Sequence, residues 1–487
     1  MAFSLTSNVS NNPQTAKSNV FMVTLVATLG GLLFGYDTAV ISGTVSSIEQ
    51  AFVLPWGLEA TARDSLTGFT VASALIGCIV GGLLAGLFSA RFGRKKSLFI
   101  AALLFLISAV GSALPELFYL PFSQASFGEP SKDWIFPFIA FRILGGIGVG
   151  LASMVSPMYI AEIAPADIRG RLVSYNQIAI VIGMVTVYFV NWAIASQGDE
   201  QWLNTVGWRW MFASECIPAA VFFVLLFLIP ESPRWLVLQG RDQDATRVLQ
   251  KFNSKEVVND ILCEIKTSVE NKHSALLSFG GLLIVVGILL SVFQQFVGIN
   301  VVLYYAPEIF RTMGATTNAA LLQTILVGVV NVVFTVVAIL TVDKHGRKPL
   351  MLIGAGMMSV SMFALGTLFY LEVTGVAAII VMSIYMAAFA LSWGPVTWVL
   401  LSEIFPNAIK SKALAIAVAV QWIANWLVSW SFKIIDGNQA LIESFNHGFA
   451  YWLYGLMGLL AALFVYFWVP ETKGKSLEEI ESIWAKV

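Results

Sequence analysis

The chain has 487 residues, of which 57% are hydrophobic and only 12% are charged, and its mean hydropathy is +0.80. In soluble domains about a quarter of the residues are charged, so this composition predicts a membrane-embedded protein. A net charge of −1 provides no basic surface for nucleic acid. The three cysteines form no CxxC or Cys/His pattern, so neither a disulfide scaffold, a metal site nor a cofactor is expected.

Twelve apolar runs are long enough to cross the hydrocarbon core of a bilayer as helices, which takes about 20 residues each. The first nineteen residues are polar and show no cleavable signal pattern, so we expect the first span to remain in the protein. The charges between residues 230 and 274 recur regularly and predict helices outside the membrane. The expected spans are 20–45, 67–89, 97–114, 134–156, 172–195, 211–229, 276–304, 320–342, 350–371, 375–402, 412–432 and 449–469.

The distribution of basic residues predicts the orientation of these spans. The side of the membrane that holds both termini has 22 Lys and Arg residues and the other side has five, while Arg142 lies within a span. Because cytoplasmic loops retain the positive excess, we expect both termini in the cytoplasm. The expected fold is all-α, with six-helix bundles at 1–229 and 275–469, a helical cytoplasmic linker at 230–274 and a cytoplasmic tail at 470–487.

Three charged motifs of the first half return in the same order in the second half. Each Gly-Arg-Lys loop joins the second and third spans of its half, and each Pro-Glu pair follows the sixth span. Two repeats of six spans, joined by a cytoplasmic linker, are the plan of the major facilitator transporters, whose substrate binds between the halves near the midplane. The matched segments are 91–96 with 344–348, 162–171 with 403–412, and 230–232 with 470–472.

These motifs resemble the signatures of the sugar porter family of the major facilitator superfamily, and the likeness extends over nearly the whole chain. Four further segments look like those of bacterial D-xylose/proton symporters: 30–38, 293–300, 392–398 and 419–422. The resemblance implies uptake of a monosaccharide together with a proton, with D-xylose the favoured sugar. We therefore expect a multi-pass protein in the lipid bilayer of a bacterial cytoplasmic membrane, functional as a monomer. Glucose or galactose symport and a proton-independent sugar facilitator remain alternatives.

Two positions depart from the pattern of the family. Ala90 stands before Arg91, where sugar porters usually carry an acid. Met184 follows Gln177 by seven residues, on the same helical face, where the xylose symporters carry a second amide. The missing acid weakens a model in which the two halves form the cytoplasmic gate in the same way. The missing amide weakens the prediction of which sugar is carried, but not the prediction that a sugar is carried.

Ionisable side chains inside a span are functional candidates, because a charge in the bilayer costs several kcal/mol unless it is paired or hydrated. Asp37 and Arg142 each lie eight residues from the outer end of their span, about 12 Å deep at 1.5 Å per residue. We expect them to pair, and protonation of Asp37 to loosen the pair and couple proton to sugar movement. Glu215 is expected to join them. The alternatives are a static pair, an Asp37 that ends a short helix beside water, and a solvated Glu215.

A sugar presents hydroxyl groups and an apolar ring face, so its pocket needs amides and an aromatic platform. The adjacent Gln294 and Gln295 lie about 100° apart on a helix and can face one point only if the helix is distorted, which Gly298 allows. The alternative role of such amides is to hold membrane helices together. The expected sugar contacts, which the resemblance also implies, are Gln177, Gln294, Gln295, Asn300, Trp398 and Gln421, with Phe34, Tyr304, Gly394 and Trp422 as neighbours.

Two features are expected to serve a conformational change. Gly394 and Pro395 interrupt the tenth span and predict a hinge, although they also fit a packed kink. Charged residues at the cytoplasmic ends of spans predict salt bridges between the bundles that close the inner side, with a solvated loop surface as the alternative. These gate candidates are Arg94, Glu162, Arg169, Glu231, Arg234, Arg347 and Glu403.

Two other classes of protein are disfavoured by the sequence. No pair of nucleophile and base and no group of metal ligands converges in the spans, so we do not expect an enzyme. A sugar-sensing receptor would need a signalling domain or a long tail, and only eighteen residues follow the last span. Transport is favoured over both.

Overall fold

The computed structural model describes residues 13–118, 129–165, 168–253, 255–270, 280–373, 375–406 and 409–473. Within these ranges every regular element is a helix, and twelve helical segments are long and apolar enough to cross a membrane. The expected all-α class with twelve spans is therefore confirmed. The predicted boundary between the linker and the second bundle, at 274 and 275, and the end of the tail beyond 473 lie outside the described residues.

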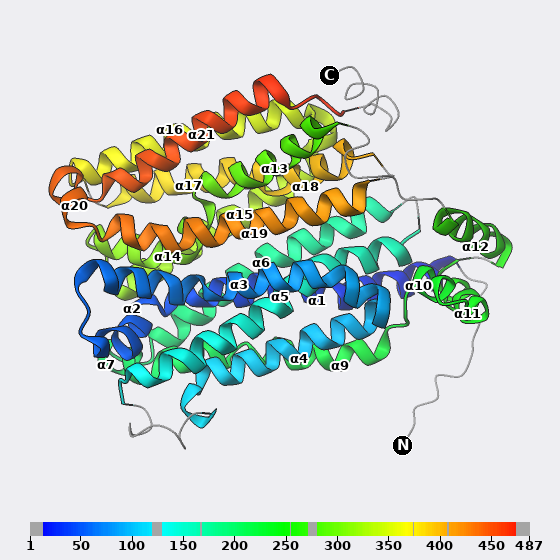
Figure 1. The fold of residues 1–487 in the computed structure, drawn as a ribbon, viewed down its shortest axis with the longest axis horizontal. Coiled ribbons are helices and arrows are strands. Elements are labelled where there is room, and N and C mark those ends of the chain that lie inside the picture. Colours follow the sequence, from blue (N-terminus) through cyan, green and yellow to red (C-terminus); the bar gives the residue numbers. More distant parts are fainter. Residues whose placement is uncertain are drawn as a thin grey trace.

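The first half is a bundle of spans coloured blue to green in Figure 1. In a bilayer each span must satisfy its own backbone hydrogen bonds, which explains why the long apolar runs form continuous helices. The fourth span contacts the first three, and the fifth packs along the first. The spans are α1 (Pro13–Val40) extended by η1 (Ile41–Gly43), α3 (Ala60–Phe92), α4 (Arg94–Ala113), η6 (Lys132–Trp134) with α5 (Ile135–Ile163), α6 (Arg169–Ala195), and a sixth built from α7 (Glu200–Trp202), η7 (Leu203–Gly207), α8 (Trp208–Ala213), α9 (Cys216–Leu225) and η8 (Leu226–Leu228). Shorter elements join them, namely α2 (Val45–Ile48), η2 (Glu49–Val53), η3 (Leu54–Trp56) and η4 (Pro115–Phe118).

Three helices follow the first bundle and lie beyond the ends of the spans, on the side where α1 begins and α21 ends (Figure 1). They are α10 (Pro233–Leu238), α11 (Asp242–Phe252) and α12 (Lys255–Glu270). The second half then forms a bundle coloured green to red. Its helices are α13 (Gly281–Phe296), α14 (Ile299–Thr312), α15 (Thr317–His345), α16 (Arg347–Tyr370), α17 (Val376–Leu391), α18 (Trp393–Ile404), α19 (Lys410–Asp436), α20 (Gln439–Phe445) and α21 (Gly448–Trp468).

Several spans are longer than the sequence predicted. The second runs over Ala60–Phe92 instead of 67–89, and the sixth begins at Glu200 instead of 211. The polar residues at these ends interrupt the apolar runs but not the helices, because a helix can continue from the hydrocarbon core into the headgroup region. Apolar runs therefore locate the bilayer crossing better than they locate the ends of the helices.

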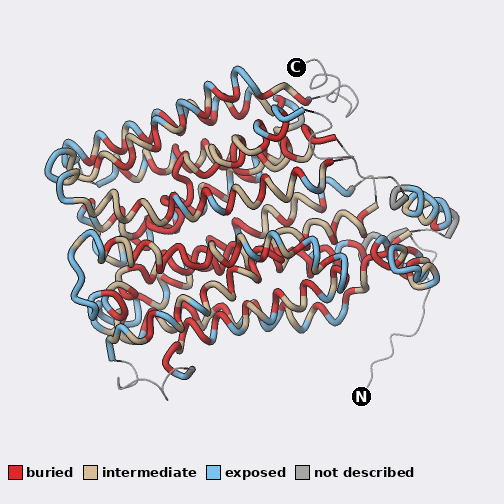
Figure 2. The backbone as a smooth tube through the Cα atoms, viewed as in Figure 1, coloured by how far each residue is buried: buried red, intermediate tan, exposed pale blue. Residues whose placement is uncertain are grey.

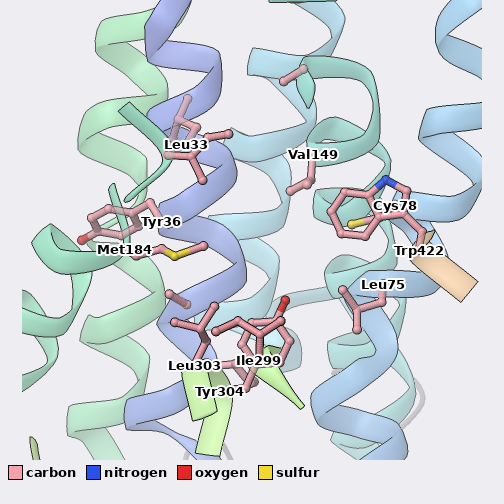
Figure 3. Packing of buried hydrophobic residues seen from close by; sticks show 14 of the residues in the cluster. Leu33, Tyr36, Leu75, Cys78, Val149, Met184, Ile299, Leu303, Tyr304 and Trp422 are labelled. Carbon is pink, nitrogen blue, oxygen red and sulfur yellow. The ribbon is translucent and has the colours of Figure 1, made fainter. Parts of the chain in front are cut away.

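Buried residues run through the middle of both bundles, while exposed residues mark the helix ends and the outward faces (Figure 2). Among the exposed side chains are large apolar ones such as Leu87 and Val360, at 68% and 70% exposure, which suits contact with lipid. Between the halves, α3 packs along α19 and α6 along α15. Figure 3 shows buried side chains of both halves in one packed region, among them Cys78 of α3 and Trp422 of α19.

Candidate functional site

The first buried feature is an ion pair inside the first bundle. Arg142 of α5 donates through Nη1 to Asp37 Oδ1 at 2.8 Å and through Nη2 to the Asp37 backbone oxygen at 3.0 Å. The two side chains are 1% and 0% exposed. Because α1 continues to Val40 beyond the carboxylate, the alternative in which Asp37 ends a short helix beside water is wrong.

Glu215 is the third member of this charged cluster. It lies at the break between α8 and α9, is fully buried, and interacts electrostatically with both Asp37 and Arg142. The solvated alternative for Glu215 is therefore wrong. Asp37 Oδ2 and both Glu215 carboxylate oxygens accept no hydrogen bond from the residues that the structure describes. An ionised carboxylate without a partner is costly in an apolar interior. Because a single arginine can balance the charge of only one of the two carboxyl groups, the other is favoured in its protonated form, and the cluster can bind a proton.

A second buried feature is a cluster of amides in the second bundle. Gln294 Nε2 donates to the Trp393 backbone oxygen at 2.9 Å, and Gln294 Oε1 accepts from Gln295 Nε2 at 3.2 Å and also from Gln421 Nε2. Asn300 Nδ2 donates to Gln295 Oε1. Four of the six expected sugar contacts thus form one hydrogen-bonded cluster from α13, α14 and α19, in which Gln294 has the most partners.

Two helix breaks place this amide cluster. Gly298 separates α13 from α14 with φ of 89°, which confirms the predicted distortion and lets Gln295 and Asn300 meet. The helix break expected at Gly394 and Pro395 lies slightly earlier, at Ser392, where φ is −127° and ψ is −90°, and it fits both the predicted hinge and the packed kink. Pro395 fits the first turn of α18 because no intrahelical bond needs its missing N–H group. The Trp393 carbonyl in this first turn accepts both the Gln294 amide and the Thr397 hydroxyl.

The aromatic candidates connect the two halves. Phe34 of α1 contacts Trp422 of α19, with ring centroids 5.5 Å apart. Tyr304 of α14 is buried; its side chain hydrogen-bonds Asn425 and interacts electrostatically with the Asp37 and Arg142 charges.

The two remaining expected sugar contacts belong to two other helices, α18 and α6. Trp398 of α18 is partly buried. Gln177 of α6 is also partly buried, and in the described part of the chain no hydrogen bond joins it to the four clustered amides. Met184, about two turns further along the same face of α6, is buried. The structure thus brings four amides together and leaves Gln177 on the opposite half.

At the end of the first bundle that faces α10, charged residues form a compact cluster. Arg94 Nη2 donates to Glu162 Oε1 at 2.7 Å, and Ser232 Oγ donates to Glu162 Oε2 at 2.5 Å. Glu231 Oε1 accepts from the Arg94 backbone N–H at 2.8 Å. Gly93 precedes Arg94 with φ of 89°, and a Cβ there would stand 2.3 Å from the Glu231 carboxylate. The motif glycine therefore permits both the turn and the close approach of the carboxylate.

The second bundle repeats this arrangement. Arg347 Nη2 donates to Glu403 Oε1 at 2.9 Å, Thr472 Oγ1 donates to Glu403 Oε2 at 2.5 Å, and Glu471 accepts the backbone N–H groups of Arg347 and Lys348. Burial alone would raise the pKa of Glu471, but the backbone N–H groups of Lys473, Arg347 and Lys348 hold it below its usual value. The internal repeat thus extends from sequence to hydrogen bonds.

These two clusters require a correction to the expected gate. Arg94 pairs with Glu162 and Arg347 pairs with Glu403, so these two ion pairs each stay within one half and do not bridge the bundles in this conformation. Arg169 donates to the Ala164 backbone oxygen at 3.4 Å, and Arg234 is exposed. In each half, hydrogen bonds connect the segment after the sixth span to helix ends of the same bundle. Three residues of these clusters were not among the expected gate residues, although the repeated Pro-Glu motifs could have indicated them: Ser232, Glu471 and Thr472.

Comparison with known proteins places the chain in a family. Residues 23–484 match the family described as Sugar (and other) transporter. The chain is 59% identical over 477 residues to the D-xylose-proton symporter of Escherichia coli (strain K12), covering 97% of each chain. It is 42% identical over 475 residues to the Glucose facilitated diffusion protein of Zymomonas mobilis, covering 97% of this chain and 98% of the relative.

A solved structure agrees with this placement. The xylose transporter XylE from E. coli, in a partially occluded inward open conformation, matches with a TM-score of 0.86 and 57% identity, over 94% of this chain and 100% of that chain. The chain therefore belongs to the sugar porter family of the major facilitator superfamily, whose relatives here are transporters.

Proposed function

We propose that this protein carries a monosaccharide, D-xylose, across a membrane together with a proton. The observation that carries the proposal is the placement of a buried Asp37–Arg142 pair, with Glu215 beside it, in one half of the molecule and a cluster of amides in the other. The choice of xylose is supported by the relative named D-xylose-proton symporter, at 59% identity over nearly the full length.

Proton coupling follows from the charges of the first bundle. With Asp37 ionised, the two hydrogen bonds from Arg142 hold the opposite charges together and fix α1 against α5. With Asp37 protonated, the attraction weakens and Arg142 turns toward Glu215, a second buried carboxyl group that interacts with it. One proton thus changes which carboxyl group Arg142 holds, and with it the contact between α1 and α5.

Sugar binding follows from the amides of the second bundle. Without sugar they hydrogen-bond to one another, while Gln421 Oε1 is buried and has no partner among the described residues. A sugar hydroxyl that donates to Gln421 Oε1 would satisfy it, and further hydroxyls would replace the bonds between amides with little net loss. The adjacent rings of Phe34 and Trp422, which are tilted 53° to each other, offer apolar faces for the sugar ring.

Two contacts connect the proton site to the sugar site. α1 carries both Phe34, which contacts Trp422, and Asp37, about one helical turn further on. Tyr304, which follows the amide Asn300 by one turn in α14, interacts with the Asp37 and Arg142 charges. A change at Asp37 therefore reaches the sugar site through α1 on one side and Tyr304 on the other.

The proposal includes an orientation and a setting. The excess of Lys and Arg on the side of the termini supports cytoplasmic termini, so α10, α11 and α12 would lie in the cytoplasm. The setting is the lipid bilayer of a bacterial cytoplasmic membrane. A single chain contains both bundles and all of the candidate site residues, which supports a functional monomer.

A facilitator that moves glucose without protons is the second candidate. It is favoured by the 42% identical relative named Glucose facilitated diffusion protein. It is disfavoured by the buried charges of Asp37, Arg142 and Glu215, which a passive carrier of neutral sugar does not need.

Purified protein in proteoliposomes separates the two candidates. Exchange of labelled xylose against unlabelled pentoses and hexoses identifies the sugar, and an imposed pH gradient tests coupling. We expect xylose to exchange and to accumulate when the outside is acidic. Exchange without accumulation would leave a facilitator, and a lack of xylose exchange would overturn the choice of sugar.

A further inference from the structure

A group of charges at the end opposite the termini takes no part in the proposed mechanism. We call it the outer cluster and define it as Glu49 of η2, Arg63 of α3, Glu308 of α14 and Lys433 of α19. The first two belong to the first half and the last two to the second. The cluster therefore lies across the interface between the bundles, on the outer side in the proposed orientation.

Lys433 occupies the centre of the outer cluster. Its Nζ pairs with Glu308 of its own half and lies 3.7 Å from Glu49 Oε2 of the other half. Glu49 Oε1 in turn lies 3.4 Å from Arg63 Nε. The Lys433 side chain is 11% exposed, so these attractions are less weakened by water than those of a surface pair.

Neighbouring contacts hold the same surfaces together. Trp430, three residues before Lys433 on α19, donates through Nε1 to the Ser65 backbone oxygen of α3 at 3.0 Å. Its ring also meets Phe69 edge to face, with centroids 6.0 Å apart. The outer ends of α3 and α19 are therefore closed on each other in this conformation.

The cluster is also built to open. A cavity of about 470 Å³ is lined by Glu49, Arg63, Glu308 and Arg311 among others. If the ion pairs of the outer cluster separate, these charged side chains can therefore remain in polar surroundings. If the Lys433 ammonium were absent, the Glu49 and Glu308 carboxylates would lose the charge that lies between them, and their repulsion would favour separation of the halves.

We infer that Lys433 is a positioning residue for the transport cycle, holding the outer side closed while the inner side is open. The inference rests on the proposed function and orientation. Glu49 is its cross-bundle partner, and Glu308 holds the lysine in place from within its own half. At the opposite end the Arg94–Glu162 and Arg347–Glu403 pairs stay within the halves, whereas the outer cluster places the largely buried Lys433 ammonium beside the Glu49 carboxylate of the other half.

Hydrogen–deuterium exchange of the full-length protein in lipid nanodiscs tests this inference. We compare Lys433→Gln and Glu49→Gln with wild type, following peptides from the outer ends of α3 and α19 and from the inner end of α4. Both variants should exchange faster at the outer ends and slower at the inner end, with the ratio of outward to inward states shifted about five-fold or more. Lys433→Arg should restore the wild-type pattern.

A matched control removes another ion pair between the halves. Arg311 Nη2 donates to Glu200 Oε1 at 2.8 Å, but the two side chains are 34% and 56% exposed. Exposed pairs contribute little, so Arg311→Gln should leave exchange at both ends unchanged.

Three results would overturn the inference. These are unchanged exchange in both test variants, faster outer exchange without slower inner exchange, and an equal response to Arg311→Gln. If Lys433→Gln does not fold, the result for Glu49→Gln alone tests the inference, because this variant retains the Lys433–Glu308 pair. The exchange measurement needs no sugar, so a failure of the proposed function, seen as absent transport, is distinguishable from a failure of this inference.

Discussion

The two halves of the molecule share a helical plan and matching charge clusters at the end near α10, yet they differ at the level of the site. In the first half three ionisable groups, Asp37, Arg142 and Glu215, are buried together. In the second half a buried cluster of neutral amides is centred on Gln294. The two halves therefore share a backbone arrangement, but one buries ionisable groups and the other buries neutral amides.

This difference assigns separate tasks to the two bundles. A buried charge responds to a proton because its partners change with its ionisation, whereas an amide donates and accepts at any physiological pH. Proton binding is therefore expected in the first bundle and sugar hydrogen bonds chiefly in the second. Substitutions on either side should then affect different measurements.

The largest effect is expected for Arg142→Gln. It leaves the buried Asp37 carboxylate without its charge partner, which costs about 3 to 5 kcal/mol when one member of a buried pair is removed. Thermal unfolding in detergent should show a large loss of stability. The double variant Asp37→Asn with Arg142→Gln should recover part of it, and a single variant as stable as wild type would contradict the pair.

Gln294→Ala is expected to act on sugar binding. It removes the amide that joins Gln295, Gln421 and the Trp393 carbonyl, at a cost of about 1 to 3 kcal/mol, so the Kd for xylose should rise roughly five- to 150-fold. Binding can be followed by calorimetry. The control is Asn191→Ala, a buried amide that donates to the Val40 backbone oxygen in the first half. If both variants bind xylose alike, the amide cluster is structural.

The motif clusters at the end near α10 allow a smaller comparison between the halves. Glu162 is 9% exposed in its pair with Arg94, while Glu403 is 26% exposed in its pair with Arg347. Because exposed pairs contribute less, Glu162→Gln should cost about 1 kcal/mol more than Glu403→Gln in thermal unfolding. Equal losses would show that the two clusters are energetically alike despite their different exposure.

The smallest effect is a dependence on acidity at Glu471. Since the folded state holds the pKa of this carboxyl below its usual value of 4.5, its contribution is present above that value and is lost as the pH falls through the lower, folded-state pKa. The melting temperature of wild type should therefore fall slightly more than that of Glu471→Gln below pH 4.5. Parallel curves for the two proteins would refute the contribution.

Much of the fold could be predicted from the sequence because a bilayer imposes simple rules. Apolar runs of sufficient length gave the twelve spans, and the matching depths of Asp37 and Arg142 predicted their pairing. The break at Gly298 was predictable because two adjacent amides needed a helix distortion to converge. In each case one local feature was sufficient.

Features that depend on the relative position of the bundles could not be predicted. The gate candidates were expected to pair between the halves, but their described pairs form within each half, and which pairing occurs depends on the conformation. Lys433 and Glu49 lie near the ends of helices, where charges are usually solvated, and only the packing of α3 against α19 brings them together. The roles of the site residues in binding and coupling stay predictions.

The most direct test of the account is transport by Asp37→Asn in proteoliposomes. The account predicts that xylose exchange continues while accumulation driven by an acidic exterior is abolished, since the amide cluster is intact and the proton site is not. Accumulation equal to that of wild type would contradict the assignment of Asp37 as the coupling residue.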